Sequence, residues 1–249
     1  LYFWHITLIY YRYYSSLNRY MAQHIVTNGC SFTQELHLNK EDSWTTKIGA
    51  VENLALGGGS NERIFYTTIE YLNAHKPDVL VIGWTDPDRF MLPNSNGSRV
   101  VVTPVHTFDE NGGGDCDEHS KFYYKHCHNE FVNFKNTLQY MIHLQEYCKA
   151  KQIKLLYFKS FFKIIDDTYL TGLAKNAFMS HEDKDIERMG IQANTNDLKN
   201  LIAKLDASIW IKELWYSMEE HCKDYPVHDL IHPGIKGSNA WAELVKKYL

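Results

Sequence analysis

Short runs rich in β-branched or apolar residues recur along the chain and predict the strands of a sheet. The clearest runs cover residues 23–28, 51–56, 78–84 and 153–160, and a shorter one covers 208–211. From Val79 to Trp84 the chain is apolar throughout, which is typical of a central parallel strand covered on both faces. The pattern therefore predicts a parallel sheet of about five strands.

Between these runs, apolar residues recur at helical spacing. The clearest helix follows Ser60, whose side chain can cap it, and ends before Pro77. A short helix is expected within residues 42–50, before the second predicted strand, and further helical patterns cover residues 131–145, parts of 183–205, 213–222 and 236–249. Because strands and helices alternate, we expect an α/β protein with the three-layer α/β/α, flavodoxin-like architecture.

Residues 85–128 show no sustained periodicity. This stretch contains Pro87, Pro93, Pro104 and the glycine triplet 112–114. A connection of this length is unusual in a compact domain, so we expect either a functional lid or a mobile insertion, with a hairpin around 98–105. Residues 21–249 are thus predicted to form a single domain with one long insertion.

The first twenty residues are rich in tyrosine and stand apart from this pattern. Their apolar run is interrupted by His5 and Arg12 and is too short to span a bilayer. It also lacks the basic start and small-residue cleavage site of a signal peptide. Since Met21 directly precedes the first predicted strand, we expect residues 1–20 to be an extension upstream of the natural start. The alternative is a terminal strand or helix packed on the domain.

Composition and charge narrow the class of protein further. The 249 residues carry 26 Lys and Arg against 30 Asp and Glu, a net charge of −4, which argues against nucleic acid as a main partner. No membrane partner is expected. The five cysteines are widely spaced and odd in number, which favours a reducing compartment, so we expect a cytoplasmic protein. The oligomeric state has no signature in the sequence.

Polar residues and glycines cluster directly after the predicted strands. These blocks are residues 28–33, 53–61 and 83–86, and a fourth block, 229–233, precedes the last helix. In open parallel sheets, ligands bind outside the carboxyl ends of the strands. We therefore expect these four blocks to converge on one site.

In this order the blocks resemble those of the SGNH (GDSL-type) hydrolase superfamily, over about residues 22–249. Gly-Cys-Ser at 29–31 is similar to the family's Gly-Asp-Ser block and implies that Ser31 is the nucleophile. The second block implies that the Gly58 N–H contributes to the oxyanion hole. The Asp-x-x-His block implies that His232 is the base and Asp229 its orienting partner. The resemblance implies a serine esterase that removes an acyl group from a small-molecule or carbohydrate ester through an acyl-Ser31 intermediate, with no cofactor or metal.

The physical chemistry of these residues agrees with that implication. A serine hydroxyl becomes a good nucleophile when an imidazole takes its proton, and a carboxylate three residues away can hold the imidazole. A serine at the start of a helix also offers its own N–H to an oxyanion.

Two positions depart from the family pattern. Cys30 replaces the usual Asp, and Thr85 stands where the third block usually has an oxyanion-binding Asn, so the expected oxyanion donors are Ser31, Gly58 and Thr85. Asn61 and Arg89 are candidate substitute donors. With Trp84, they are the expected substrate-binding residues.

These departures leave other functions open. A catalytically weak or inactive relative could act as a carbohydrate-binding or structural protein, and the NGCSFT and LGGGSN forms resemble phage-encoded members of the superfamily. Cys30 is an alternative nucleophile. The histidines and cysteines of residues 115–128 are the only candidate zinc cluster, and we interpret them as a solvated loop because their spacing fits no standard pattern.

Overall fold

The computed structural model describes residues 23–93, 99–102, 107–109, 117–161, 163–177, 184–229 and 231–249. The expected extension at residues 1–20 lies outside these ranges, as does Met21. The elements are β1 (Ile25–Asn28), α2 (Ser31–Gln34), η1 (Lys40–Asp42), α3 (Trp44–Lys47), β2 (Ala50–Asn53), α4 (Asn61–Ala74), β3 (Val79–Trp84), β4 (Phe90–Pro93), β5 (Arg99–Val102), β6 (Thr107–Asp109), α5 (Asp117–His126), α6 (Glu130–Lys151), β7 (Lys154–Lys159), α7 (Asp167–Ala177), α8 (Lys184–Ile202), η2 (Ala207–Ile209), α9 (Met218–Cys222) and α10 (Ile235–Lys246).

The main sheet is parallel throughout and has the order β2-β1-β3-β7. The two inner strands, β1 and β3, are buried along their whole length, as the apolar sequence of β3 predicts. Beside β7, Trp210 and Ser217 form isolated parallel bridges to Tyr157 and Lys159. The segment that contains them therefore occupies a fifth position in the sheet, close to the expected five strands.

Two predictions for this fifth segment were wrong in detail. Residues 208–211 were expected to form a strand, and 213–222 a helix, but the helix α9 spans only Met218–Cys222. Lys212 and Trp215 both have left-handed backbone angles, with φ of 68° and 69°. Such angles interrupt a strand or a right-handed helix, so the segment meets the sheet only at single residues.

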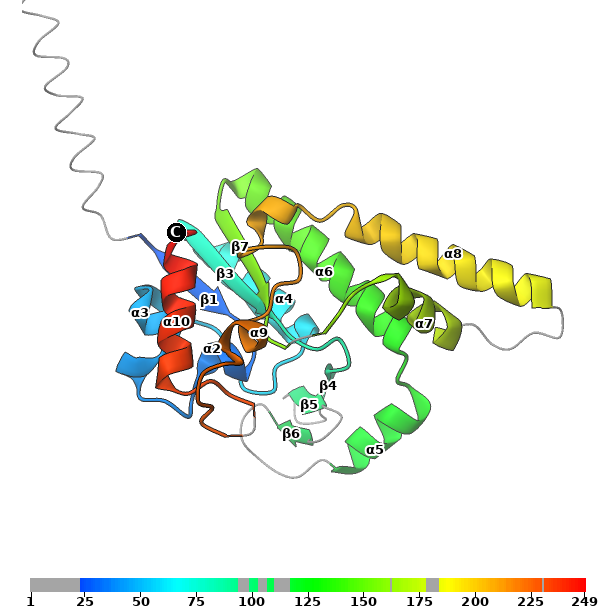
Figure 1. Cartoon of the computed structure of the whole chain (residues 1–249), viewed down its shortest axis with the longest axis horizontal. Coiled ribbons are helices and arrows are strands. Elements are labelled where there is room, and N and C mark those ends of the chain that lie inside the picture. The colour runs from blue at the N-terminus through cyan, green and yellow to red at the C-terminus, as the bar shows by residue number, and fades with distance from the viewer. Residues whose placement is uncertain are drawn as a thin grey trace, which may run out of the picture.

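Helices cover both faces of the sheet, as expected for a three-layer α/β/α fold (Figure 1). One apolar core joins the sheet to α4 and α6, with α7 and α8 packed outside α6. The other joins it to α2, α3, α9 and α10. The alternation of side chains along β3 explains this division, since Leu80 and Ile82 belong to the first core and Val79 and Val81 to the second.

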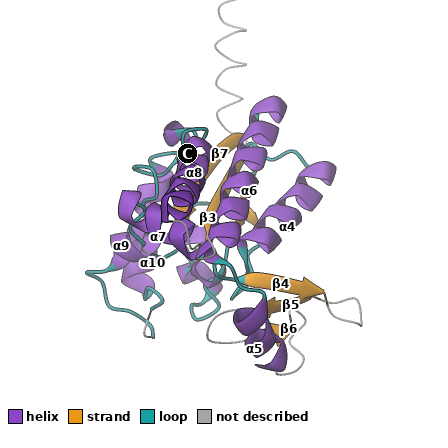
Figure 2. Cartoon of the chain, turned by 90° about the vertical axis from the view of Figure 1, so that its right-hand side faces the viewer, coloured by secondary structure: helices purple, strands orange, loops and turns teal. Residues whose placement is uncertain are grey.

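The insertion contains a small antiparallel sheet, β4-β5-β6, followed by α5. Strand β5 lies within the residues expected to form a hairpin. Figures 1 and 2 both place these elements next to the carboxyl end of β3. The Tyr124 hydroxyl donates to the Asp88 carbonyl at 2.6 Å, and the Phe90 and Tyr123 rings stack with centroids 4.6 Å apart. These contacts attach α5 to the start of the insertion.

None of the helices within the described ranges combines the length and the hydropathy needed to cross a bilayer.

Candidate active site

The turn after β1 places Ser31 at the start of a short helix. Asn28 is fully buried, and its side-chain oxygen accepts a hydrogen bond from the Gly29 N–H at 2.8 Å. A side chain at Gly29 has no space, because a Cβ there would lie 2.2 Å from Thr33 Oγ1. The chain therefore turns sharply from the sheet into α2, and its first residue, Ser31, is half-buried at the carboxyl edge.

The loop before α10 positions Asp229 and His232. The Gly234 N–H donates to the Pro226 carbonyl at 3.0 Å, and a Cβ on Gly234 would lie 2.8 Å from that oxygen, so the close approach favours glycine. Asp229 Oδ1 accepts the backbone N–H groups of Ile231 at 2.9 Å and His232 at 2.8 Å. These two bonds hold the carboxylate against the imidazole of the same turn.

The structure brings the three expected triad residues together. Asp229 Oδ2 lies 2.7 Å from His232 Nδ1, and His232 Nε2 lies 2.8 Å from Ser31 Oγ. With Nδ1 protonated towards the carboxylate, Nε2 is free to accept the serine proton. This arrangement can activate a hydroxyl for attack on an acyl carbon.

The charge on Asp229 suits the orienting role. Its hydrogen bonds hold the pKa of the carboxyl well below its ordinary value, with the His232 N–H contributing most and the Ile231 N–H and the His232 imidazole adding to it. The Asp229 side chain is 46% exposed, whereas that of His232 is only 18% exposed. An ionised, partly exposed carboxylate thus faces a mostly covered imidazole.

Two aromatic rings flank the His232 imidazole. The Phe32 ring centroid lies 5.2 Å away and that of His37 lies 5.0 Å away. His37 Nε2 also lies 3.0 Å from the Pro233 carbonyl oxygen, and burial lowers the pKa of His37, which favours its neutral form. His37 therefore contributes to holding the loop that carries His232. Sequence reasoning missed this residue, because no local pattern relates it to His232.

A loop beside Ser31 offers backbone donors. In the part of the chain that the structure describes, the N–H groups of Ser31 and Gly58 have no hydrogen-bond partner. Gly58 has a φ of 74°, and a Cβ on the preceding Gly57 would lie 3.9 Å from the Ser31 Cβ. The Gln34 side chain fixes this loop by accepting the Gly57 N–H. Gln34 was also missed, since its role depends on a contact between distant segments.

The side chain of Asn61 is hydrogen-bonded to the backbone of Thr85. Asn61 Nδ2 donates to the Thr85 carbonyl at 3.0 Å and to Thr137 Oγ1 at 3.1 Å, and its oxygen accepts the Thr85 N–H at 2.8 Å. Both amide protons of Asn61 are therefore used within the protein, which disfavours its expected role as a substrate or oxyanion donor. Thr85 Oγ1 is buried and has no partner among the described residues, so its hydroxyl is available to a ligand.

The other two expected substrate-binding residues lie on the same edge. Trp84 is fully buried and lines a pocket with Thr85 and Phe161. The Arg89 guanidinium carbon lies 4.7 Å from the centroid of the Phe161 ring, and the Phe161 ring is 4.8 Å from that of Phe32, the neighbour of Ser31. Arg89 therefore stacks on Phe161, and its Nη1 is buried without a partner among the described residues.

Cys30 and the candidate zinc residues have other environments. Cys30 is fully buried, which disfavours the alternative of a cysteine nucleophile. His128 Nε2 lies 3.1 Å from Asp88 Oδ1, in a contact that attaches the insertion. Asp115 and Cys116 lie outside the described residues.

Comparison with protein-family models and with curated proteins found no match. Solved structures with a similar backbone course include a protein from Desulfitobacterium hafniense DCB-2 that is described as lipolytic and of the G-D-S-L family. Its sequence is 11% identical and the TM-score is 0.47. The match covers 92% of this chain and 100% of that chain. A psychrotrophic esterase from Pseudoalteromonas sp. has 11% identity, a TM-score of 0.44 and coverage of 91% and 98%. An acetyl xylan esterase has 11% identity, a TM-score of 0.44 and coverage of 91% and 99%. The assignment of a function therefore depends on the geometry of the site itself.

Proposed function

We propose that the protein is a serine ester hydrolase of the SGNH type, which removes an acyl group from a small-molecule or carbohydrate ester. The observation that carries the proposal is the continuous chain of contacts from Asp229 to His232 to Ser31, at 2.7 and 2.8 Å. These contacts join residues far apart in sequence at the carboxyl edge of a parallel sheet, where ligands bind. Contacts of this kind activate a serine hydroxyl for attack.

In the first half of the reaction, Ser31 Oγ attacks the ester carbonyl carbon while His232 Nε2 takes its proton. The carbonyl oxygen becomes an oxyanion, stabilised by the N–H groups of Ser31 and Gly58 and by the Thr85 hydroxyl. When the carbon–oxygen bond to the alcohol breaks, His232 returns the proton to the departing alkoxide, and the acyl group remains on Ser31.

In the second half, His232 takes a proton from a water molecule that attacks the acyl carbon. The bond to Ser31 Oγ then breaks, the serine recovers its proton from His232, and the carboxylic acid leaves. Throughout both halves, Asp229 holds His232 in the tautomer that accepts at Nε2 and stabilises the imidazolium that forms.

Covalent labelling tests this proposal directly. We expect a fluorophosphonate probe to add one adduct to the parent protein, measured by intact-mass spectrometry, and no adduct to the Ser31→Ala or His232→Ala variants. Ser208→Ala is the matched control, because Ser208 is exposed in η2 and its hydroxyl donates only to Asp206, so this variant should leave labelling unchanged.

Thermal unfolding of each variant distinguishes a lost nucleophile from a lost fold. An adduct that persists in Ser31→Ala would contradict the mechanism. A folded parent protein that takes no adduct would favour the non-catalytic, carbohydrate-binding or structural alternative.

A further inference from the structure

An open cleft of about 450 Å³ lies between the segment that follows α2 and the loop that carries His232. Residues within 37–42 form one wall, and residues 226–228 and 234–236 form the other. Both walls adjoin α2, α3 and α10, which cover the same face of the sheet (Figure 1). Small-molecule sites in proteins have volumes of about 300 to 1,000 Å³, so this cleft has room for a substrate group.

The cleft lies on the same side of its loop as the proposed base, His232. Val227 and Pro233 form an antiparallel bridge, and the His228 N–H donates to the His232 carbonyl at 2.9 Å. His228 and His232 are therefore opposite each other, and opposite residues of an antiparallel pair project on the same face. Since His228 lines the cleft, the cleft and the base share one face of the loop.

His37 connects the cleft to the base. It lines the cleft, and its ring centroid is 4.9 Å from that of His228 and 5.0 Å from that of His232. His232 Nε2 in turn lies 2.8 Å from Ser31 Oγ. Only the His232 imidazole therefore separates this wall of the cleft from the proposed nucleophile.

The alcohol part of an ester would lie on this side of Ser31. In the proposed reaction His232 Nε2 returns a proton to the departing alkoxide, so the alcohol oxygen must lie next to His232. The carbonyl oxygen faces the N–H groups of Ser31 and Gly58 instead. The group attached to the alcohol oxygen is thus the part of the substrate nearest to the cleft.

Hydrogen bonds between the two walls hold the cleft in shape. His37 Nε2 lies 3.0 Å from the Pro233 carbonyl oxygen, and the Ser238 hydroxyl of α10 donates to the Asp42 carbonyl at 3.0 Å. Lys47 Nζ donates to the same carbonyl at 2.7 Å. Because these bonds form within the protein, a ligand meets walls that are already in place, which lowers the free-energy cost of binding.

The lining offers hydrogen-bond donors and acceptors next to apolar side chains. Asp42 supplies a carboxylate, Lys236 an ammonium, and Asn39 an amide that both donates and accepts. Val227 and Ile235 are exposed beside them. A hydroxyl group also donates and accepts at once, so a ligand with several hydroxyls on a carbon ring matches this lining.

The charges of the cleft favour a neutral ligand. Asp42 and Lys236 have opposite charges, so neither an anion nor a cation meets an excess of the opposite sign. Burial lowers the pKa of His37, which favours its neutral form. The His228 ring nitrogens have no hydrogen bond to another described residue, so they are available to a ligand.

We propose, on the basis of the serine hydrolase function above, that this cleft binds the alcohol part of the substrate and selects a neutral polyol, such as a monosaccharide, with His228 as a specificity-determining residue. The hydroxyl groups bind His228, Asn39 and the Asp42 carboxylate, and the carbon–hydrogen faces of the ring contact Val227 and Ile235. An alkyl alcohol of similar size would fill the cleft without these hydrogen bonds.

The kinetic test compares two esters that share a butanoyl group and a six-membered ring joined to it through one methylene group. These are the butanoyl ester at the primary hydroxyl of methyl α-D-glucopyranoside and cyclohexylmethyl butanoate, and butanoate release is measured in a pH-stat. We expect kcat/KM to be about tenfold higher for the sugar ester, the effect of one or two neutral hydrogen bonds. His228→Phe keeps a ring beside His37 but removes both ring nitrogens, and should lower this ratio about fivefold.

Two further variants make the test specific to the cleft. Asn39→Leu should also lower the ratio, and it should leave the fold intact because the Asn39 side chain makes no capping bond to η1. His75→Phe is the matched control, since His75 also stacks on a ring, that of Tyr71, with centroids 4.4 Å apart. His75 follows the last turn of α4, about 20 Å along the helix from Asn61, and its replacement should leave the ratio unchanged.

A binding measurement separates this proposal from the hydrolase function itself. Saturation-transfer NMR of Ser31→Ala protein with the sugar ester should show transfer to the ring protons of the sugar, and adding His228→Phe and Asn39→Leu should abolish it. Equal kcat/KM for the two esters, or a ratio that His228→Phe and Asn39→Leu leave unchanged, would overturn the cleft assignment and leave the hydrolase function standing. If neither ester is hydrolysed, the binding measurement decides the cleft alone, and transfer that is absent, or unchanged in the variants, would overturn it.

Discussion

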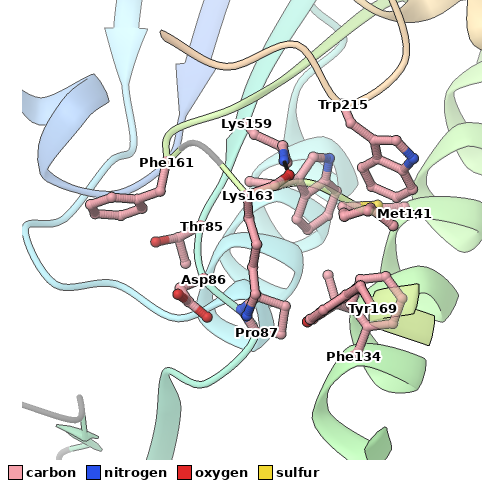
Figure 3. Close-up of a pocket in the computed structure, with 13 residues that line it drawn as sticks. Thr85, Asp86, Pro87, Phe134, Met141, Lys159, Phe161, Lys163, Tyr169 and Trp215 are labelled. Atoms are coloured by element: carbon pink, nitrogen blue, oxygen red, sulfur yellow. Dashed lines mark hydrogen bonds between the residues drawn. The ribbon is translucent and has the colours of Figure 1, made fainter. Parts of the chain in front are cut away.

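At the scale of single residues, Thr85 is the position where the candidate site departs most from an ordinary oxyanion hole. Its backbone is held on both sides by Asn61, so the residue has little freedom to move. Its hydroxyl is buried without a partner in the described structure, and Figure 3 shows it on the side of the pocket where Phe161 lies. A buried hydroxyl without a partner costs free energy, which is tolerable where the group has a role in the reaction.

Thr85→Val tests that role, because it replaces the hydroxyl by a methyl group of similar shape. We expect kcat to fall about 10²-fold, since one oxyanion donor is lost, while the free energy of unfolding stays the same or rises by up to about 1 kcal/mol. Thr85→Ser keeps the hydroxyl and should retain most of the activity. Turnover of a para-nitrophenyl ester and chemical denaturation measure the two effects, and a Val variant as active as the parent would remove Thr85 from the oxyanion hole.

At the scale of elements, Asn61 is the residue that joins helix to sheet beside the site. It is the first residue of α4, is 2% exposed, and binds the end of β3 and Thr137 on α6. Its side chain therefore fixes three elements at the carboxyl edge. An amide suits this position because it donates and accepts at once, which neither a carboxylate nor a hydrocarbon side chain can do.

Asn61→Ala leaves the Thr85 N–H and carbonyl without their partners. We expect the free energy of unfolding to fall by about 2 to 4 kcal/mol, because each buried unpaired group costs about 1 to 3 kcal/mol. Glu70→Ala, at an exposed position on the same helix, is the control and should change stability by less than about 0.5 kcal/mol. Urea denaturation measures both, and an Asn61→Ala protein as stable as the control would contradict the joining role.

The same scale shows what the sequence could and could not reveal. Strands β1, β3 and β7 were predicted from local apolar runs, and α4 from its Ser60 cap, because those signals lie within each element. The strand expected at 208–211 and the helix expected at 213–222 were wrong. The left-handed backbone angles at Lys212 and Trp215 interrupt both elements, and the pattern of apolar residues does not reveal such angles. Helix α7 was not predicted. His37 acts only through contacts with a distant segment, so no local pattern could identify it.

At the scale of the whole molecule, a buried acid connects the helical layer on the Ser31 side. Glu35 directly follows α2 and is 2% exposed. Its Oε2 accepts the Trp44 N–H of α3 at 2.7 Å and the Ser238 hydroxyl of α10 at 3.3 Å. Burial raises the pKa of Glu35 from 4.5 to about 7, and the hydrogen bonds from Trp44, Ser43 and Ser238 only partly oppose this effect. Below about pH 7, the protonated acid is therefore the favoured form of Glu35 in the folded protein.

This preference makes the stability of the protein depend on pH. In the unfolded chain, Glu35 loses its proton near pH 4.5, whereas in the folded protein it keeps it until about pH 7. Its contribution to stability is thus complete below pH 4.5 and is lost as the pH rises to about 7, a change of about 3 kcal/mol at 1.36 kcal/mol for each pKa unit. Burial lowers the pKa values of His37 and His221, so these residues change stability in the opposite direction, but they do so equally in the parent and in a Glu35→Gln variant.

We therefore expect the free energy of unfolding of the parent, relative to Glu35→Gln, to fall by about 3 kcal/mol between pH 4.5 and pH 8, measured by urea denaturation across that range. Glu70→Gln, on the exposed face of α4, should give a difference that does not vary with pH. A pH-independent difference for Glu35→Gln as well would show that Glu35 is ionised within the folded protein and that the junction of α2, α3 and α10 holds a charge.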